Sequence, residues 1–527
     1  MAGGTWIDQN KVRPGVYINY KSAPASLATM GERGTVAIAR VMDWGAQGKF
    51  YTIESPSDCA QFGHAITDPE MLFVRQILLG SNRTQGATKI LVWSLNQVAG
   101  STEEATASGW NESSSGTGKI KDLLFDGSTR DYLPGYTYTF VRFINPNAFV
   151  NGEVINHEGK IAVKYDINNA SGACQGAEIL ITENGSAKAT ATLGNLVATA
   201  KYDGTFGNRL AVDVTSDSPN YIVQTYLDGV VVDSQTVAAI GGLVANDYIV
   251  FSGTALSAAA KTALTGGANG TPTTTAYSDF LNALELQKFD VVIYDGTDAT
   301  TKTAFADFVK RLSNQEGVKC QAVLSDATNP DNECIINVYP QAVTLSDGTA
   351  LAASELTWWV GGASAGANVF ESLTYAAYPD AVEVNPVLTS SQQEAAINAG
   401  KFALISQFDR IQVLTDINSF VTFAVEKGKA FRKNRVIRTV FGLCNDIYRT
   451  FATYYVGAVH NDEEGRNSLK AEILNLMNRY QGNRALQNVE ADDVTVSAGV
   501  DSDAVVIEIY IQPVDSIEKI YVNITIS

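Results

Sequence analysis

The chain has 527 residues, a formal net charge of −18 and 45% hydrophobic residues. This length exceeds what one hydrophobic core usually supports, so we expect three or four domains. The ordinary charged content of 18% excludes wholesale disorder, and no apolar run approaches the roughly 20 residues that cross a bilayer. The first residues lack the apolar core of a secretion signal, so we expect a soluble cytoplasmic protein without direct membrane insertion.

The residue types that usually bind metals are few and dispersed. The five cysteines show no C-x-x-C spacing, and the three histidines lie far apart in the chain. Isolated cysteines of this kind are typically buried small apolar side chains. We therefore predict no metal site and no cofactor. The residues concerned are Cys59, Cys174, Cys320, Cys334, Cys444, His64, His157 and His460.

The N-terminal 33 residues are predicted to form an extended arm. Glycine and proline punctuate this segment, and only Val16–Tyr20 has strand character. A single strand this close to a terminus needs a sheet to join, either in its own domain or in a neighbouring molecule. The predicted strand contains Val16, Tyr17, Ile18, Asn19 and Tyr20.

A compact α/β module is predicted to follow the arm. Strands at 35–41 and 89–94 flank a helix at 68–79, with Pro69 near the start of the helix and Gly80 just after its end.

The sequence changes character after Val98. Ser101–Gly118 is rich in Ser, Thr and Gly, which predicts a flexible linker. Segments with strand alternation follow, and the pairs Asn184-Gly185 and Asp228-Gly229 are strong hairpin signals. The region up to about Gly270 is therefore predicted to be all-β and to contain a sandwich.

Helices and strands alternate from Thr275 onward. Buried strands at 290–294 and 318–324 are each preceded by a predicted helix, at 276–287 and 301–315. This alternation favours a parallel α/β sheet.

The last third of the chain is predicted to be α+β. A helix at 431–456 would carry an apolar stripe, with Arg432, Arg435 and Arg438 directed away from that stripe. Asn461 or Asp462 would cap a second helix at 466–480. Two strands at 505–512 and 519–526 would close the chain, with Ile520, Val522, Ile524 and Ile526 on one face of the last strand.

One short motif raises the possibility of catalysis. Gly362-Ala363-Ser364-Ala365-Gly366 matches the G-x-S-x-G pattern of serine hydrolases, whose chemistry needs a strand leading into a sharp turn that exposes the serine. Here the preceding residues 350–360 have helical character, which favours a packed helix instead. No G-x-x-x-x-G-K-[ST] phosphate loop occurs. We predict that the chain is not an enzyme, and a serine hydrolase using Ser364 stays open as the alternative.

The stretch Leu414–Val440 carries the most information about function. It contains six cations with no acidic residue between them, although the whole chain is strongly acidic. Exposed helix faces normally mix both signs of charge, so this run predicts a surface that faces a specific acidic partner. Nucleic acid fits less well, because a polyanion binder is usually basic over much more of its surface. The cations are Lys427, Lys429, Arg432, Lys433, Arg435 and Arg438.

Several stretches of the chain resemble one protein family. The pattern DINS-x-V-T-F, followed by K-G-K-x-F-R-K-N-R-V-I-R-T, lies within Asp416–Thr439. It is similar to the C-terminal region of contractile phage tail sheath proteins, in particular those of Gram-positive myophages and defective prophages. Lys11–Pro24 resembles the N-terminal arm of this family, and Trp359–Tyr375 resembles another of its segments.

The resemblance implies a multidomain α+β fold. In the family, a strand like 89–94 soon leads to a segment like the one that begins at Ala187, so residues 100–186 are expected to be an insertion on the outer surface. The expected domains are a linking arm at 1–33, an α/β module at 34–99, an inserted outer β domain at 100–186, a β-sandwich at 187–272, a subtilisin-like α/β domain without catalytic residues at 273–390, and a tube-facing α+β domain with a linking strand at 391–527.

The resemblance also implies a mechanical function. Many copies of the chain would polymerise as a helical sleeve of stacked rings around a tail tube, and contraction would drive the tube through a target envelope. The implied partners are the chain itself, the tail tube protein, and the baseplate and tail-terminator proteins. The implied location is a virion tail or tail-like particle assembled in a bacterial cytoplasm. A static structural array protein stays open as a further alternative.

The resemblance finally assigns roles to three groups of residues. The six cations would face the tube. Val16–Tyr20 and the last strand would each join a sheet in an adjacent subunit, because backbone hydrogen bonds can hold subunits together while their domains pivot. The last strand contains Ile520, Tyr521, Val522, Asn523, Ile524, Thr525 and Ile526.

Overall fold

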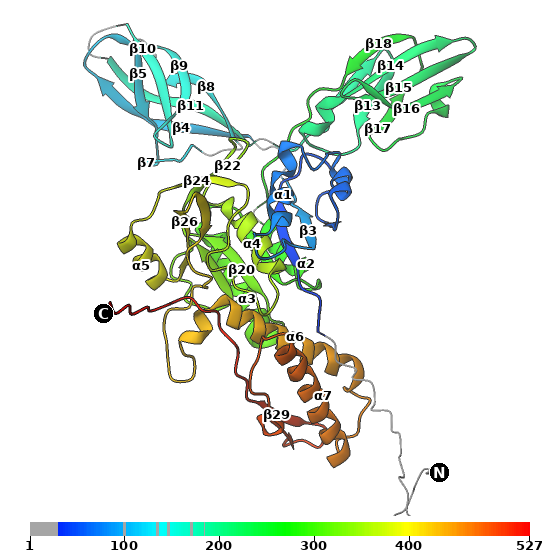
Figure 1. Cartoon of the computed structure of the whole chain (residues 1–527). Helices are drawn as coiled ribbons and strands as arrows, with labels where there is room; N and C mark the ends of the chain where they lie inside the picture. The colour runs from blue at the N-terminus through cyan, green and yellow to red at the C-terminus, as the bar shows by residue number, and fades with distance from the viewer. Residues whose placement is uncertain are drawn as a thin grey trace, which may run out of the picture.

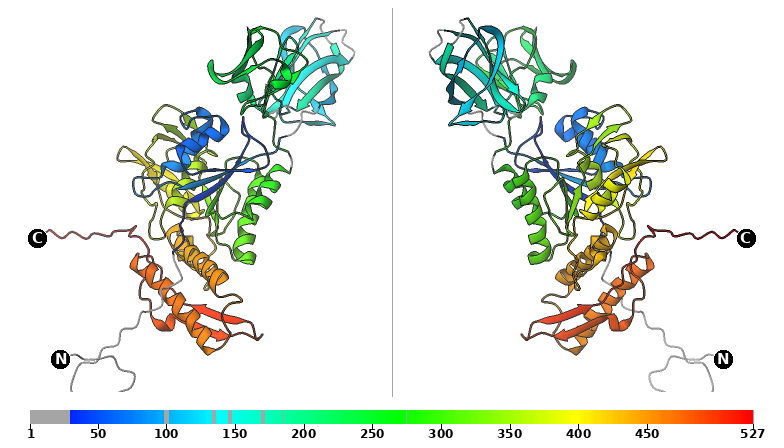
Figure 2. Two further views of the ribbon diagram at one scale, coloured as in Figure 1. Left: turned by 90° about the vertical axis from the view of Figure 1, so that its right-hand side faces the viewer. Right: turned by 90° about the vertical axis from the view of Figure 1, so that its left-hand side faces the viewer.

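The computed structural model describes residues 30–97, 102–132, 136–144, 148–168, 172–183, 185–273 and 275–526. Two β domains project from one end of a central α/β domain, and a smaller helical domain lies at the opposite end (Figure 1). Side views show the same order of domains (Figure 2). The predicted class of a multidomain protein with both helices and sheets is confirmed.

A seven-stranded sheet forms the centre of the protein, with the order β2-β3-β1-β19-β20-β21-β25. Six of its strands run parallel, and only the edge strand β2 is antiparallel. Strand β1 pairs with β3 on one side and with β19 on the other. The segments predicted as two α/β domains, 34–99 and 273–390, therefore form one domain, and β25 extends it past residue 390. The strands are β1 Thr35–Arg40, β2 Phe50–Ile53, β3 Lys89–Ser94, β19 Val291–Tyr294, β20 Gln321–Ser325, β21 Ile335–Val338 and β25 Lys401–Phe402.

Helices cover both faces of this sheet. Val36 and Ile38 of β1 pack toward α1 and α4, whereas Ala37 between them packs toward α2 and α3. Strands that are buried on both faces need apolar residues at every position, which explains the continuous apolar runs seen in the sequence. The helices of this domain are α1 Leu72–Leu79, α2 Ala276–Leu284, α3 Ala299–Arg311, α4 Leu356–Gly366 and α5 Ser390–Asn398.

The G-x-S-x-G match lies inside helix α4 and not at a turn after a strand. Ser364 is fully buried, and its Oγ has no hydrogen-bond partner among the described residues. A Cβ atom on Gly362 would lie 2.0 Å from the Ile77 carbonyl oxygen, and one on Gly366 would lie 2.1 Å from the Gly86 carbonyl oxygen. The glycines therefore permit close packing of α4, and the geometry that the hydrolase alternative requires is contradicted.

The first β domain, residues 102–183, consists mainly of two three-stranded sheets around a common core. Its strand β4 (Thr102–Glu112) pairs with β11 (Gly172–Glu183) along most of its length. The prediction of a flexible linker over Ser101–Gly118 is thus wrong, because burial of Ala105 and Ala107 outweighs the weak strand preference of this composition. The other strands are β5 Gly116–Asp122, β6 Leu124–Phe125, β7 Ser128–Thr129, β8 Tyr136–Ile144, β9 Phe149–His157 and β10 Lys160–Ile167.

The second β domain is a sandwich of a three-stranded and a four-stranded sheet, as predicted. Asp228 and Gly229 join β15 to β16, and both have the positive φ of a type I′ hairpin turn. The predicted hairpin at Asp228-Gly229 is therefore confirmed, whereas Asn184 of the other predicted hairpin lies outside the described residues. The strands are β12 Thr190–Leu193, β13 Leu196–Ala200, β14 Leu210–Asp217, β15 Asn220–Leu227, β16 Val230–Val237, β17 Ile249–Gly253 and β18 Ala259–Ala263.

A buried histidine lies where the sandwich meets the central domain. The Nε2 of His64 is 3.0 Å from the Asp43 carboxylate, and its Nδ1 is 3.1 Å from Asp68 Oδ2. The His64 ring also contacts Phe206 of the sandwich, at 5.4 Å between ring centroids, and Arg209 Nη1 lies 3.4 Å from Nδ1. Burial alone would lower the pKa of His64, but the hydrogen bonds and charges of the surrounding carboxylates outweigh it and raise the pKa.

Protonated His64 should therefore stabilise this junction. Its contribution is fully present below the unfolded pKa of about 6.5, and it is lost as the pH rises through the raised folded pKa. The unfolding midpoint of the wild type should exceed that of H64Q by more at pH 5.5 than at pH 8.5. The exposed His460 provides the control variant H460Q, which should show no such trend. A pH-independent difference between wild type and H64Q would contradict the prediction.

The C-terminal domain packs two helices against a small two-stranded sheet. The predicted cap is confirmed, because the Asp462 carboxylate accepts a hydrogen bond of 2.8 Å from the Gly465 N–H. The first helix is more buried than predicted near its start, since Ile437 and Phe441 also belong to the core of the central domain. The elements are α6 Asn434–Tyr454, α7 Glu463–Gly482, β28 Val494–Ala498 and β29 Val505–Ile509.

Candidate assembly surfaces

The C-terminal tail leaves the body of the protein after a short anchored segment. The Val514 N–H donates to the Ala485 carbonyl at 2.9 Å, and Pro513 forms a β-bridge with Leu486. The end of the chain runs away from the domains as an extended trace (Figures 1 and 2). The tail residues 519–526 form no strand within the described chain, so the predicted last strand joins no sheet in the described part of its own subunit.

The apolar side chains of this tail are exposed to solvent. The exposed fractions of Ile520, Tyr521, Val522, Ile524 and Ile526 lie between 75% and 93%. Alternating apolar residues that remain uncovered resemble an edge strand that lacks its sheet. We therefore expect the apolar side chains of the tail to become buried only when a surface of another molecule covers them.

The other predicted linking strand, Val16–Tyr20, lies outside the described residues. Its role stays a prediction from the sequence.

Two of the six cations in the basic run are paired with acids from distant parts of the same chain. Lys427 Nζ lies 2.6 Å from Glu333 Oε1. Lys433, the residue before α6, forms an ion pair with Glu518 at the base of the tail. These two charges are thus largely neutralised within the subunit.

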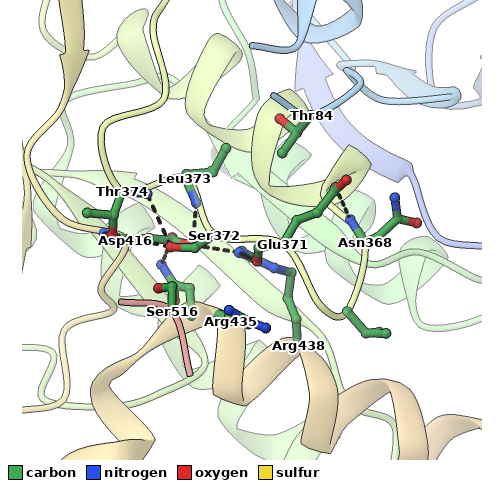
Figure 3. A network of polar contacts seen from close by, with 12 residues as sticks. Thr84, Asn368, Glu371, Ser372, Leu373, Thr374, Asp416, Arg435, Arg438 and Ser516 are labelled. Carbon is green, nitrogen blue, oxygen red and sulfur yellow. Dashed lines mark hydrogen bonds and ion pairs between the residues drawn. The ribbon is translucent and has the colours of Figure 1, made fainter. Parts of the chain in front are cut away.

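Arg438 does not belong to the surface. Its side chain is fully buried and forms an ion pair of 2.5 Å with Asp416, which is also buried. Arg438 Nη2 donates to the Glu371 carbonyl, and Asp416 accepts from the Leu373 N–H (Figure 3). We therefore remove Arg438 from the tube-facing patch, because the central domain covers this side of α6.

The remaining three cations differ in their accessibility. Lys429 is exposed, and no ion pair or hydrogen bond involves its side chain in the described part of the chain. Arg432 is only 8% exposed, and its Nε and Nη2 atoms have no partner among the described residues. Burial lowers the pKa of Arg435, and the nearby Asp515 opposes this effect. Lys429 and Arg432 thus retain cationic groups without an acidic partner.

The described residues offer no obvious metal site, since they contain no group of three or more His, Cys, Asp or Glu side chains that could hold an ion. Among the described helices, none combines the length and the apolar content that spanning a bilayer requires.

Comparison with solved structures identifies the family. A sheath tail protein from Desulfitobacterium hafniense is 35% identical in sequence and superimposes with a TM-score of 0.72, covering 96% of this chain and 99% of the other. The chain belongs to the phage tail sheath protein family. It is a structural sheath subunit, and a sheath tail protein from Listeria innocua is also similar, with 28% identity, a TM-score of 0.66, and coverage of 94% and 96% of the two chains.

Family models describe four parts of this sheath subunit. Residues 33–93 match the Gp18 domain III N-terminal region of tail sheath proteins, and residues 184–269 match the tail sheath β-sandwich domain. Residues 270–419 match the tail sheath central domain, and residues 426–527 match the tail sheath C-terminal domain. A phage-like element PBSX protein of Bacillus subtilis, XkdK, is 28% identical over 563 aligned residues that cover both chains completely.

The sequence alone did not identify the acids that form ion pairs with the basic run. Asp416 lies inside the sequence motif but gave no sign of pairing with Arg438, and Glu518 precedes the predicted last strand without a local feature that points to Lys433. No local sequence pattern indicates these ion pairs, because Glu333 and Glu518 are 94 and 85 residues away from the lysines that they pair with.

Proposed function

We propose that the subunit polymerises as a helical sleeve around a tail tube, and that contraction of the sleeve drives the tube through a target envelope. The exposed, alternating tail of a sheath family member is the observation that carries this proposal. The sleeve would be part of a virion tail or a prophage-derived particle, with baseplate and terminator proteins at its ends. Electron microscopy of the concentrated protein tests it, because a contractile sheath gives hollow tubes of two lengths whereas a static array gives one.

The tail would link neighbouring subunits by adding a strand to a sheet. A suitable acceptor is the sheet of β28 and β29, which contains only two strands in the described chain. One face of this sheet packs through Val494 and Ile507 against the core around α7, while the outer edge of each strand has no neighbouring strand in that sheet. Strand addition there would satisfy backbone groups of both partners.

The contact with the tube would rest mainly on the exposed Lys429, and the largely buried Arg432 would join it through its unpartnered Nε and Nη2 atoms when the tube docks. An exposed ion pair contributes only about 0.2–1 kcal/mol, but the pairs of a whole ring of subunits would add up and still break singly during contraction. Lys433 and Arg435 would carry less of this function than the sequence implied, since Lys433 pairs with Glu518 and the charge of Asp515 acts on Arg435.

Charge changes at these two positions should block assembly around the tube. We expect K429E/R432Q to form empty sleeves but not to coat tubes in a mixture of sheath and tube proteins, as seen by electron microscopy. Salt at about 1 M, where the Debye length is roughly 3 Å, should act on the wild type in the same way. The variant K121E changes an exposed lysine of the first β domain and should coat tubes normally. Normal coating by K429E/R432Q would remove this patch from the mechanism.

The first β domain would lie on the outside of the sleeve. It has its own core and lies between the regions that match sheath domains at 33–93 and 184–269. Replacing residues 100–186 by a short linker should leave sleeve assembly and contraction intact. Loss of assembly by a deletion variant that still folds would show that this domain takes part in subunit contacts.

The central sheet would correspond to the subtilisin-like fold that the sequence resemblance implies, with protease chemistry absent. Its mostly parallel strand order with helices on both faces supports this assignment.

A further inference from the structure

Glu518 is the last residue of the tail that makes a polar side-chain contact with the body of the described chain. One of its carboxylate oxygens, Oε2, forms an ion pair with Lys433. The other, Oε1, accepts a hydrogen bond of 2.8 Å from Thr374 Oγ1 and one of 3.4 Å from Ser516 Oγ. The Glu518 side chain is only 15% exposed, whereas all described residues after it are exposed. The described tail therefore contacts the body of the subunit through the Glu518 carboxylate and is exposed to solvent beyond it.

The partners of Glu518 are themselves connected to other parts of the subunit. Thr374 Oγ1 also accepts a hydrogen bond of 3.0 Å from the Asp416 N–H, and Asp416 is held by the buried pair with Arg438 (Figure 3). Lys433 occupies the N-cap position of α6. A continuous polar network thus connects the base of the tail to the central domain and to the start of α6.

A second acid of the tail base acts on the basic run through its charge. Asp515 lies three residues before Glu518, and its charge acts favourably on Arg435 of α6. The tail base therefore forms one ion pair, between Glu518 and Lys433, and the charge of Asp515 acts on Arg435 without an ion pair among the described residues.

We propose that Glu518 is the positioning residue of the C-terminal linking arm. Its clasp with Lys433 and Thr374 sets the direction in which residues 519–526 leave the subunit, and so selects the neighbouring sheet that they reach. This inference rests on the linking function proposed above. In extended form, residues 519–526 span about 26 Å, so even a small rotation at their base moves the tip away from its acceptor.

Fixing the direction of the tail at Glu518 should also favour the rate and the free energy of assembly. A tail that already points toward its acceptor loses less conformational freedom on binding, and its effective concentration at that acceptor is higher. Without the clasp, the same tail would explore many directions that reach no partner sheet.

The variant E518Q tests the clasp, because it removes the charge and keeps the shape of the side chain. We expect its melting temperature to stay close to that of the wild type, since the clasp lies at the surface of the folded domains. A fluorophore on I526C should show faster anisotropy decay in E518Q, and the protein concentration needed for sleeves to form should rise at least about tenfold. The charge swap K433E/E518K should restore both properties, and E394Q, at an exposed acid of α5, should change neither.

The proposal is wrong if the E518Q protein shows wild-type tail mobility and wild-type assembly. A charge swap that fails to rescue both readouts would equally exclude Lys433 as the partner that sets the direction. Truncation after Glu518 tests the linking function separately. If the truncated chain still assembles, the tail does not link subunits. The anisotropy of labelled E518Q then decides alone whether Glu518 fixes the direction of the tail.

Discussion

Truncating the chain after Glu518 should leave a folded subunit that no longer forms sleeves. The removed residues make no strand pairing within the described part of their own subunit, so the domains should keep their stability. In the sleeve, each tail would bury apolar side chains such as Ile520, Val522 and Ile524, each of which contributes about 1.5–3 kcal/mol when fully covered. Losing several such contacts from every link of a polymer should abolish assembly.

Sedimentation and electron microscopy measure this effect, and circular dichroism with thermal melting checks that the subunit still folds. The double variant V522D/I524D keeps the full length but places charges on the apolar face, so it should fail in the same way. The matched variant N523S/T525S changes the opposite face and should assemble. Long sleeves formed by the truncated chain would disprove the linking role of the tail.

The variant R438M should destabilise the subunit by about 3–5 kcal/mol, because it leaves the Asp416 carboxylate buried without its cation. Both side chains of this pair are at most 1% exposed, so water cannot compensate for the lost charge. The substitution keeps much of the volume of the side chain, which limits any contribution from a cavity. The pair joins α6 to the central domain, so the contact between these two domains should weaken first.

The midpoint of urea-induced unfolding, followed by fluorescence, measures this loss. K429M removes a cation from the same sequence run at an exposed position, and it should change stability by no more than about 0.5 kcal/mol. If R438M unfolds at the same urea concentration as K429M, the buried pair does not stabilise the domain contact.

The sequence determined the local features of this protein. Apolar runs such as 89–94 became buried strands, Asp228-Gly229 formed its hairpin, and Asp462 capped its helix. Each of these depends on interactions within a few residues, which periodicity and turn chemistry record directly. The sheath motifs likewise identified the family before any contact was known.

Only the tertiary structure decided which distant segments meet. It joined β1 to β19 in one sheet, made a strand of 102–112, and placed Ser364 inside a packed helix. It also paired three of the six cations in the basic run, Lys427, Lys433 and Arg438, with acids that are not their sequence neighbours. Strand pairing and charge neutralisation depend on long-range contacts, and no local pattern encodes the partner.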